Sequence, residues 1–339
     1  MNEPIPEPAG APAPIPAPVA AYKDRSTGLV IFGILTILMG CVAALIALLS
    51  LAGFAIAAKN PNVPPTPPST ILLALFLYGG VAVGLIWLGI GSIMARRWAR
   101  ALLLIFSWGW LIIGVVMTIA MPIIMPKTFT NLPANPNGQP ALPPGAITGM
   151  IVGMTLFFGF FFVLLPAVWI FFYRSPHVKA TCEARDPVTR WTDACPLPVL
   201  GFCLWLWFAV PMFLLMPIIG HGVMPLFGMF VNGLPGSLLC VAMAALWAWC
   251  GWLIYKLDAR GWWLILIVLI IFTASSVLTY SRHTMLELYQ QMGYPQAQID
   301  QMQKMGFFTS HWMVWLMLFS MVPFLGYLLF IKKYLQRKA

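Results

Sequence analysis

The sequence predicts an all-α protein: a polytopic transmembrane helical bundle of about eight spans. Hydrophobic residues make up 61% of the 339-residue chain and charged residues 8%, against about 45–50% and about 25% in soluble domains. The apolar residues also gather in uncharged runs of about 20 residues or more, the length that crosses about 30 Å of hydrocarbon. This composition excludes a soluble enzyme, a nucleic-acid-binding protein and a secreted disulfide scaffold.

Each predicted span lacks Asp, Glu, Lys and Arg. Each should be helical, because lipid offers no partner to an unpaired backbone N–H or C=O. The linker 220–233 is too short and too broken by Gly and Pro to cross, so we expect it to be interfacial or re-entrant. The eight predicted spans are residues 29–57, 70–95, 101–125, 147–173, 199–219, 237–255, 262–280 and 312–331.

The distribution of Lys and Arg predicts that both termini are cytoplasmic, in the plasma (inner) membrane. With that orientation the short outer loops hold four basic residues, namely Lys59, Lys127, Arg282 and Lys304. Fifteen basic residues lie inside, as the positive-inside rule requires. They are spread over five segments, so we interpret the net charge of +10 as an attraction to anionic lipid and not as a nucleic-acid signal.

Five segments follow from this layout. Residues 1–25 are a Pro/Ala-rich tail, predicted to be disordered and cytoplasmic. Residues 26–173 form a first four-span half, 174–198 a cytoplasmic linker, and 199–334 a second four-span half. The second half includes an outer amphipathic hairpin at 281–310, with two short helices at 282–292 and 295–305 that Gly293 and Gly306 terminate. Residues 335–339 are a basic tail.

The two halves resemble each other around one turn. Residues 91–105 and 251–265, at an offset of 160, share five identities, among them Gly91/Gly251 and Arg100/Arg260. Four spans return the chain to the same side, so tandem halves would have the same orientation. The alternative is coincidence in a sequence that is rich in Leu, Ile and Ala.

The motif Arg-Arg-Trp-Ala-Arg at residues 96–100 follows the small residues Gly89 and Gly91. Over about 20 residues this turn resembles a cytoplasmic hairpin of uncharacterised prokaryotic polytopic membrane proteins. The resemblance implies a membrane protein with an interfacial Trp, and it implies no activity.

The spans carry no carboxylate or basic residue for a proton relay or counter-ion, which argues against ion-coupled transport. Unwound helices near Pro166, Pro211 or Pro323 could still bind ions, although such prolines are usually structural.

Small residues spaced by four predict close helix packing, at Gly80/Gly84, Gly149/Gly153 and Ala244/Ala248. A polar cluster in the seventh span predicts interhelical hydrogen bonds or, alternatively, a substrate groove: Thr273, Ser275, Ser276 and Thr279.

Metal sites are weakly indicated. His177, Cys182 and Cys195 share the 174–198 segment but lack a standard zinc spacing. Met302, Met305, His283 and His311 could suggest Cu(I), yet an amphipathic hairpin explains the methionines as well. We therefore predict no catalytic residue, no metal, no cofactor and no enzymatic activity.

Two function classes remain. In the first, the protein is a structural or interaction component of the membrane, which binds lipid, a membrane-protein partner or a second copy of itself. In the second, it is a channel or carrier for a neutral or apolar solute that needs no intramembrane charge relay. Charge-free spans and small-residue faces favour the first.

The topology is directly testable in intact cells. Cysteines introduced at Arg97, in the 174–193 loop or in the C-terminal tail should resist impermeant thiol reagents, whereas cysteines at Asn62, Asn137 and Gln296 should react. Labelling at position 97 in sealed cells would reverse the assignment.

Overall fold

The computed structural model describes residues 22–60, 68–130, 143–305 and 312–335. Among these residues, seven helical segments are long and apolar enough to cross a membrane: Ser26–Ala57, Thr70–Ile93, Arg97–Pro122, Gly145–Arg174, Leu197–Ile219, Gly233–Tyr255 and Ala259–Arg282. The predictions of helical architecture and of a multi-pass membrane protein are confirmed. The eighth predicted span coincides with a 24-residue helix, α13 (Trp312–Leu335), whose membrane crossing stays a prediction.

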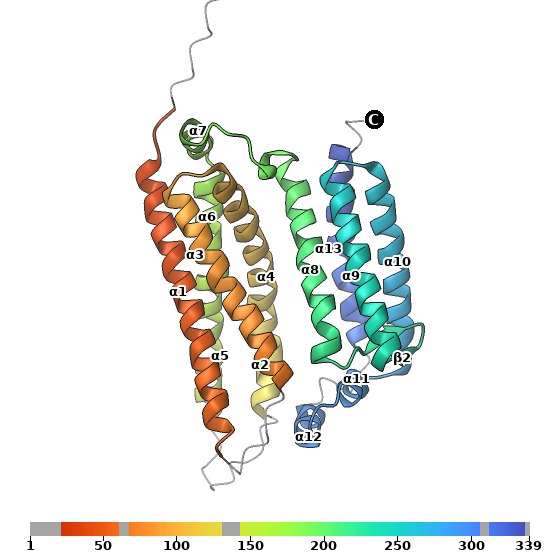
Figure 1. Cartoon of the computed structure of the whole chain (residues 1–339). Helices are drawn as coiled ribbons and strands as arrows, with labels where there is room; N and C mark the ends of the chain where they lie inside the picture. Colours follow the sequence, from red (N-terminus) through yellow and green to blue (C-terminus); the bar gives the residue numbers. More distant parts are fainter. Residues whose placement is uncertain (1–21, 61–67, 131–142, 306–311, 336–339) are drawn as a thin grey trace, which may run out of the picture.

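The spans form two groups that lie side by side (Figure 1). The first group contains α1 (Ser26–Ala57), α2 (Pro68–Ala74) continued by η1 (Leu75–Gly79) and α3 (Gly80–Ile93), α4 (Arg97–Thr130), and α5 (Pro144–Phe158) continued by η2 (Gly159–Leu164) and α6 (Leu165–Arg174). Here η1 and η2 are π-helical turns. The second group contains α8 (Leu197–Ile219), α9 (Gly233–Tyr255), α10 (Ala259–Arg282) and α13.

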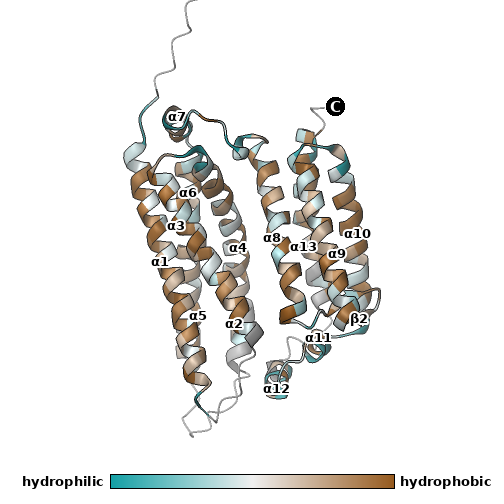
Figure 2. Ribbon diagram, in the orientation of Figure 1, coloured by the Kyte–Doolittle hydropathy of each residue, from teal (hydrophilic) through white to brown (hydrophobic). Residues whose placement is uncertain are grey.

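Shorter elements cap the two ends of the helices. One end carries α7 (Pro176–Arg185) and η3, a short 3₁₀ turn (Trp191–Asp193). The other carries α11 (Met285–Gln291), α12 (Gln296–Met305) and a hairpin of β1 (Met224–Leu226) and β2 (Met229–Val231). Hydrophilic residues concentrate at these ends, and hydrophobic ones along the long helices (Figure 2). α1 begins and α13 ends at the α7 end (Figure 1).

Glycines bring α1 and α3 into close contact. A Cβ on Gly33 would lie 2.8 Å from the carbonyl oxygen of Gly89, and a Cβ on Gly89 would lie 2.7 Å from that of Gly33. Packing within the chain is not found at Gly80/Gly84 and Gly149/Gly153, because a Cβ on any of these four would meet no neighbour within 4 Å in the part of the chain that the structure describes. Spacing alone does not say which face of a helix meets a neighbour.

The turn between α3 and α4 has a counterpart between α9 and α10, but not at the predicted register. Ala95 and Leu257 both adopt positive φ, 52° and 60°. The next N–H in each turn, of Arg96 or Asp258, donates to a carbonyl five residues earlier. The turns therefore correspond at an offset of 162 residues, and the 160-residue alignment, with its Arg100/Arg260 match, is wrong here by two positions. A tandem duplication of the whole halves stays a proposal.

The helices continue through the prolines that were considered as breaks. Pro211 lies inside α8 and Pro323 inside α13. Pro166 is buried at the start of α6, directly after the π-helical turn η2. The structure thus gives no support to an ion site built on unwound backbone at these prolines.

The linker 220–233, predicted to be interfacial or re-entrant, contains an antiparallel β-hairpin of β1 and β2. Its turn residues Phe227 and Gly228 both have positive φ, 43° and 93°, as a two-residue hairpin turn with the right-handed twist needs. The Phe227 N–H donates to Ser275 Oγ (2.9 Å) and the Gly228 N–H donates to Thr279 Oγ1 (3.0 Å). Ser275 and Thr279 of the polar cluster therefore hold this turn, and Thr273 donates a hydrogen bond from its hydroxyl to Met321 Sδ of α13 (3.2 Å), as the predicted interhelical hydrogen bonds require.

The two short helices predicted at 282–292 and 295–305 are present as α11 and α12, with bounds a few residues shorter than expected. Leu288 on α11 packs with Val223 and Tyr280 in a small core, and Met285 and Met292 cover it. Ile299 on α12 is 2% exposed. The N-terminus of α11 is closed by Thr284 and Glu287, each of which caps the other's backbone N–H.

The role of the α10 hydroxyls can be tested by amide exchange. Thr279→Val and Ser275→Ala should each leave one turn N–H without its acceptor, at a cost of about 1–2 kcal/mol. The Gly228 amide should then exchange about tenfold faster in Thr279→Val, and the Phe227 amide in Ser275→Ala. Ser281→Ala is the control, because its exposed hydroxyl bonds only within its own helix, to Leu278 O. Unchanged exchange at Gly228 in Thr279→Val would show that the hydroxyl does not hold the turn.

Candidate functional site

Charged side chains gather at the α7 end. Six of the eight ion pairs between described residues join the α3–α4 turn, α7, the loop after α7 and Asp24. We call residues 23–25, 94–100 and 176–197 the polar cap. It corresponds to the hydrophilic layer around α7 in Figure 2.

The cap includes part of the segment that the sequence predicted to be a free tail. Residues 1–21 lie outside the described residues, but the Lys23 N–H donates to His177 Nδ1 (3.3 Å) and the Arg25 N–H donates to Thr181 Oγ1 (3.1 Å). Both acceptors are on α7. Residues 23–25 therefore belong to the folded protein, and the predicted boundary at 25 is too late.

A buried carboxylate holds the cap together. Asp186, at the end of α7, is 2% exposed and lies 3.6 Å from an Arg96 nitrogen and 3.3 Å from an Arg190 nitrogen. The Arg97 backbone N–H also points to its Oδ2, at 3.4 Å. A carboxylate withdrawn from water is tolerated only when it is paired and hydrogen-bonded. Asp186 thus couples the α3–α4 turn to the loop after α7.

The same loop reaches the second group of helices. Tyr255 of α9 donates a hydrogen bond from its hydroxyl to Trp191 O (2.8 Å). Leu197 packs against the buried cores of both groups. The cap is therefore a physical link between the two helix groups.

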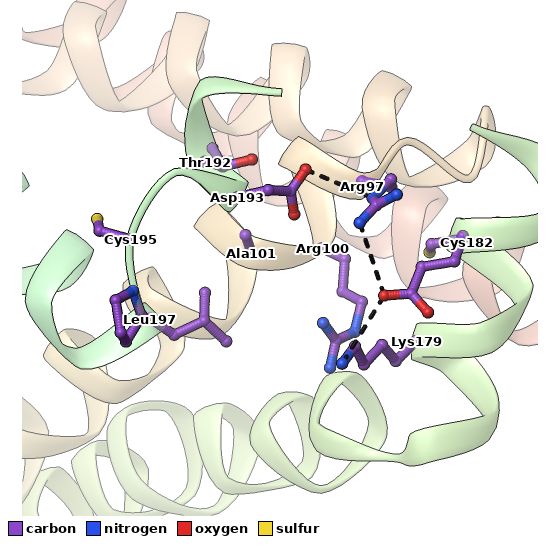
Figure 3. A pocket seen from close by; sticks show the side chains of 11 residues that line it. Arg97, Arg100, Ala101, Lys179, Cys182, Thr192, Asp193, Cys195 and Leu197 are labelled. Carbon is purple, nitrogen blue, oxygen red and sulfur yellow. Dashed lines mark ion pairs between the residues drawn. The ribbon is translucent and has the colours of Figure 1, made fainter. Parts of the chain in front are cut away.

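A cavity of about 290 Å³ lies within the cap, between the first turn of α4, α7 and the 192–197 segment. Figure 3 shows arginine and lysine side chains around it, with the Thr192 hydroxyl on the side of Asp193 and Arg97. Its lining residues are Arg97, Arg100, Ala101, Lys179, Cys182, Glu183, Thr192, Asp193, Cys195, Pro196 and Leu197.

The cations of the cavity are not equally compensated. Arg97 pairs with Glu183 (3.7 Å) and with Asp193 (3.4 Å), and Lys179 pairs with Glu183 (3.7 Å). Arg100 forms no ion pair within 4 Å with any residue that the structure describes. Three cations face two carboxylates, so the lining carries an excess positive charge.

Two hydrogen-bond donors of the lining have no acceptor. Arg100 Nε and Thr192 Oγ1 are both buried without a hydrogen-bond partner in the described part of the protein, and Thr192 as a whole is 2% exposed. Most buried polar groups in proteins are paired, so each exception needs an explanation. Here two exceptions belong to residues that line one cavity.

The cysteines of the cavity do not reduce its positive charge. Burial raises the pKa of the Cys182 thiol to about 11, although the nearby Arg100 opposes this, and burial raises the pKa of the Cys195 thiol to about 11. Both are neutral thiols at pH 7. Across the described residues there is no group of three or more His, Cys, Asp or Glu side chains placed to hold a metal ion.

The other metal hypothesis involves the α12 end. His283 Nδ1 lies 2.7 Å from Glu287 Oε2, within the capped turn of α11. His311, the second histidine considered for Cu(I), lies outside the described residues. The imidazole of His283 thus has a structural partner.

Sequence reasoning named no site residue and missed Arg100, Thr192 and Asp186. It interpreted the 96–100 motif as a topology signal only. One feature of the sequence indicated a site at this position. Arg97 and Arg100 are three residues apart, so they share a helix face, and this face lies one turn from the start of the apolar run. No pattern indicated that the acids of the 186–193 loop fold back onto that face.

The coupling role of Asp186 predicts a loss of stability on neutralisation. Asp186→Asn should lower the free energy of unfolding by about 1–3 kcal/mol, less than for a fully buried pair because both arginines are partly exposed. Thermal unfolding of the full chain in mild detergent measures this. Asp24→Asn removes an exposed ion pair with Arg185 and should leave the unfolding midpoint unchanged. Equal midpoints for all three proteins would mean that Asp186 does not couple the elements of the cap.

Comparisons of the chain with protein-family models, curated proteins and solved structures gave no match. The resemblance of the 96–100 turn to prokaryotic membrane proteins therefore stays a prediction. The helical segments indicate an integral, multi-pass membrane protein, and its role has to be argued from its own residues.

Proposed function

We propose that this protein is an interaction component of the membrane, which holds an anionic lipid or a partner protein at its polar cap and carries no ion across the bilayer. The observation that carries the proposal is the segregation of charge. Ion pairs and an uncompensated arginine gather in the cap, whereas the predicted spans contain no charged residue. The excess of basic residues on that side supports a cytoplasmic cap in the plasma (inner) membrane.

Polar side chains inside the helix groups support the same view, because several are satisfied within the protein. The Ser92 and Tyr173 hydroxyls are 2.7 Å apart, Trp169 Nε1 donates to Thr36 Oγ1 (3.3 Å), and Trp262 Nε1 donates to Leu328 O (2.8 Å). Groups engaged in this way stabilise packing and leave little to coordinate a passing ion.

A channel or carrier for a neutral solute is the second candidate, and specific observations favour it. Thr118 Oγ1 and Trp247 Nε1 are buried in spans without a partner among the described residues. Thr118 lies beside the π-helical turn η2, since a Cβ on Gly159 would be 3.9 Å from its methyl group. Such turns are frequent at functional sites.

Flux measurements separate the two candidates. Proteoliposomes containing the full chain should take up no solute in response to a proton or Na⁺ gradient, and should equilibrate glycerol and urea no faster than empty liposomes. Protein-dependent flux of a neutral solute that falls in Trp247→Phe or Thr118→Val, but not in the control Ser281→Ala, would overturn the interaction proposal. It would establish the carrier in its place.

A further inference from the structure

We infer that the cavity of the polar cap is a binding site for a phosphate-type anion, supplied as the headgroup of an anionic lipid or as free phosphate. The inference rests on the proposed function and names the chemistry of what the cap holds. Nothing in the sequence pattern assigned such a site.

The first argument is the pair of donors without acceptors. Leaving a buried donor unpaired costs about 1–3 kcal/mol, and two residues that line the cavity each hold such a donor, Arg100 Nε and Thr192 Oγ1. They come from different elements, α4 and η3, so the folding of one local turn does not explain both. A phosphate oxygen accepts from an N–H and an O–H alike.

The second argument is charge. Glu183 and Asp193 already compensate Arg97, and Glu183 also compensates Lys179. Arg100 is the lining cation whose charge is left over, and the two cysteines add no negative charge. An anion is therefore the complementary ligand. A guanidinium is suited to phosphate, because its planar N–H groups match the spacing of two phosphate oxygens.

The third argument is position within α4. The helix begins at Arg97, so its first turn, with the partial positive charge of the helix N-terminus, borders the cavity at Arg97, Arg100 and Ala101. This adds to the field of the side chains. It also places Arg100 one turn inside a helix that continues as a span, where lipid headgroups meet hydrocarbon.

The lining is apolar on one side, and this favours a lipid as the source of the phosphate. Ala101, Pro196 and Leu197 face the cavity beside the charged residues. A headgroup phosphate could then be held by Arg100 and Thr192 while the glycerol portion contacts these side chains. A cytoplasmic surface rich in Lys and Arg would attract such lipids in any case.

Two binding measurements on the full chain test the inference. The first titrates inorganic phosphate into protein in a nonionic detergent and follows the heat of binding. The second purifies protein from phosphatidylcholine membranes that contain phosphatidylglycerol, and counts the retained phosphatidylglycerol by native mass spectrometry. The variants are Arg100→Gln, Arg100→Lys and Thr192→Val. Arg174→Gln is the matched control, because it removes the same charge from an exposed position at the same end of the helices.

Binding should weaken about tenfold or more in Arg100→Gln, as expected for a hydrogen bond to a charged group, less in Arg100→Lys, and measurably in Thr192→Val. The control should match the wild type. If this pattern appears with inorganic phosphate, the site takes free phosphate; if it appears with phosphatidylglycerol alone, the site is for a headgroup. Absence of binding by the wild type would overturn the inference. Binding by Arg100→Gln and Thr192→Val that equals wild-type binding would overturn it as well.

Thr192→Val keeps the test decisive should Arg100→Gln fail to fold. Valine has the shape of threonine and removes only a hydroxyl that has no partner in the described structure, so a purely structural role predicts unchanged binding. The result also separates the two proposals. If no anion binds and no solute flux is found, the interaction function stands and the cap holds another ligand. Solute flux overturns the interaction function even if phosphate binds.

Discussion

Hydrocarbon offers no hydrogen bond to a polar group, and this constraint shapes the whole molecule. It requires the long apolar segments to be helical, and it favours nearby partners for the polar side chains within them. Ser92 meets Tyr173, Trp169 meets Thr36, and the hydroxyls of Ser275 and Thr279 serve the backbone of a β-turn. Charged residues are left to the ends of the helices, where water and lipid headgroups can solvate them (Figure 2).

At one end these charges form an ordered layer. Asp186 is almost completely buried, yet it is surrounded by Arg96, Arg190 and the backbone N–H of Arg97. A lone carboxylate at that position would be too costly; with its partners it connects two elements that are far apart in the chain. Because the following loop also bonds to Tyr255 and Leu197 packs against both cores, the cap joins the two helix groups.

The buried polar side chains of the cap have partners except at its cavity. Arg97 and Lys179 are compensated, whereas Arg100 and Thr192 present donors that no described group accepts. Elsewhere in the cap the buried polar groups have partners. The two donors without partners belong to residues that line one cavity, and this cavity is complementary to an acceptor with negative charge. The interaction function and the anion site follow from the same distribution of charge, and independent measurements test them.

The sequence by itself determined the long apolar helices, because hydropathy over about 20 residues is a local property that decides whether a segment can cross a bilayer. It also indicated the two helices of the outer hairpin, through apolar stripes and glycines at their ends. Only the tertiary structure decided where the charges go. Arg96 and Asp186 are 90 positions apart, so no local pattern could pair them. Arg100 and Thr192 are also far apart in the chain, so no local pattern could place them at one cavity. The structure also gave the register of the two similar turns. Backbone conformation at Ala95 and Leu257 defines their correspondence, because the residue with positive φ and the hydrogen bond that follows it close the end of a helix in both turns.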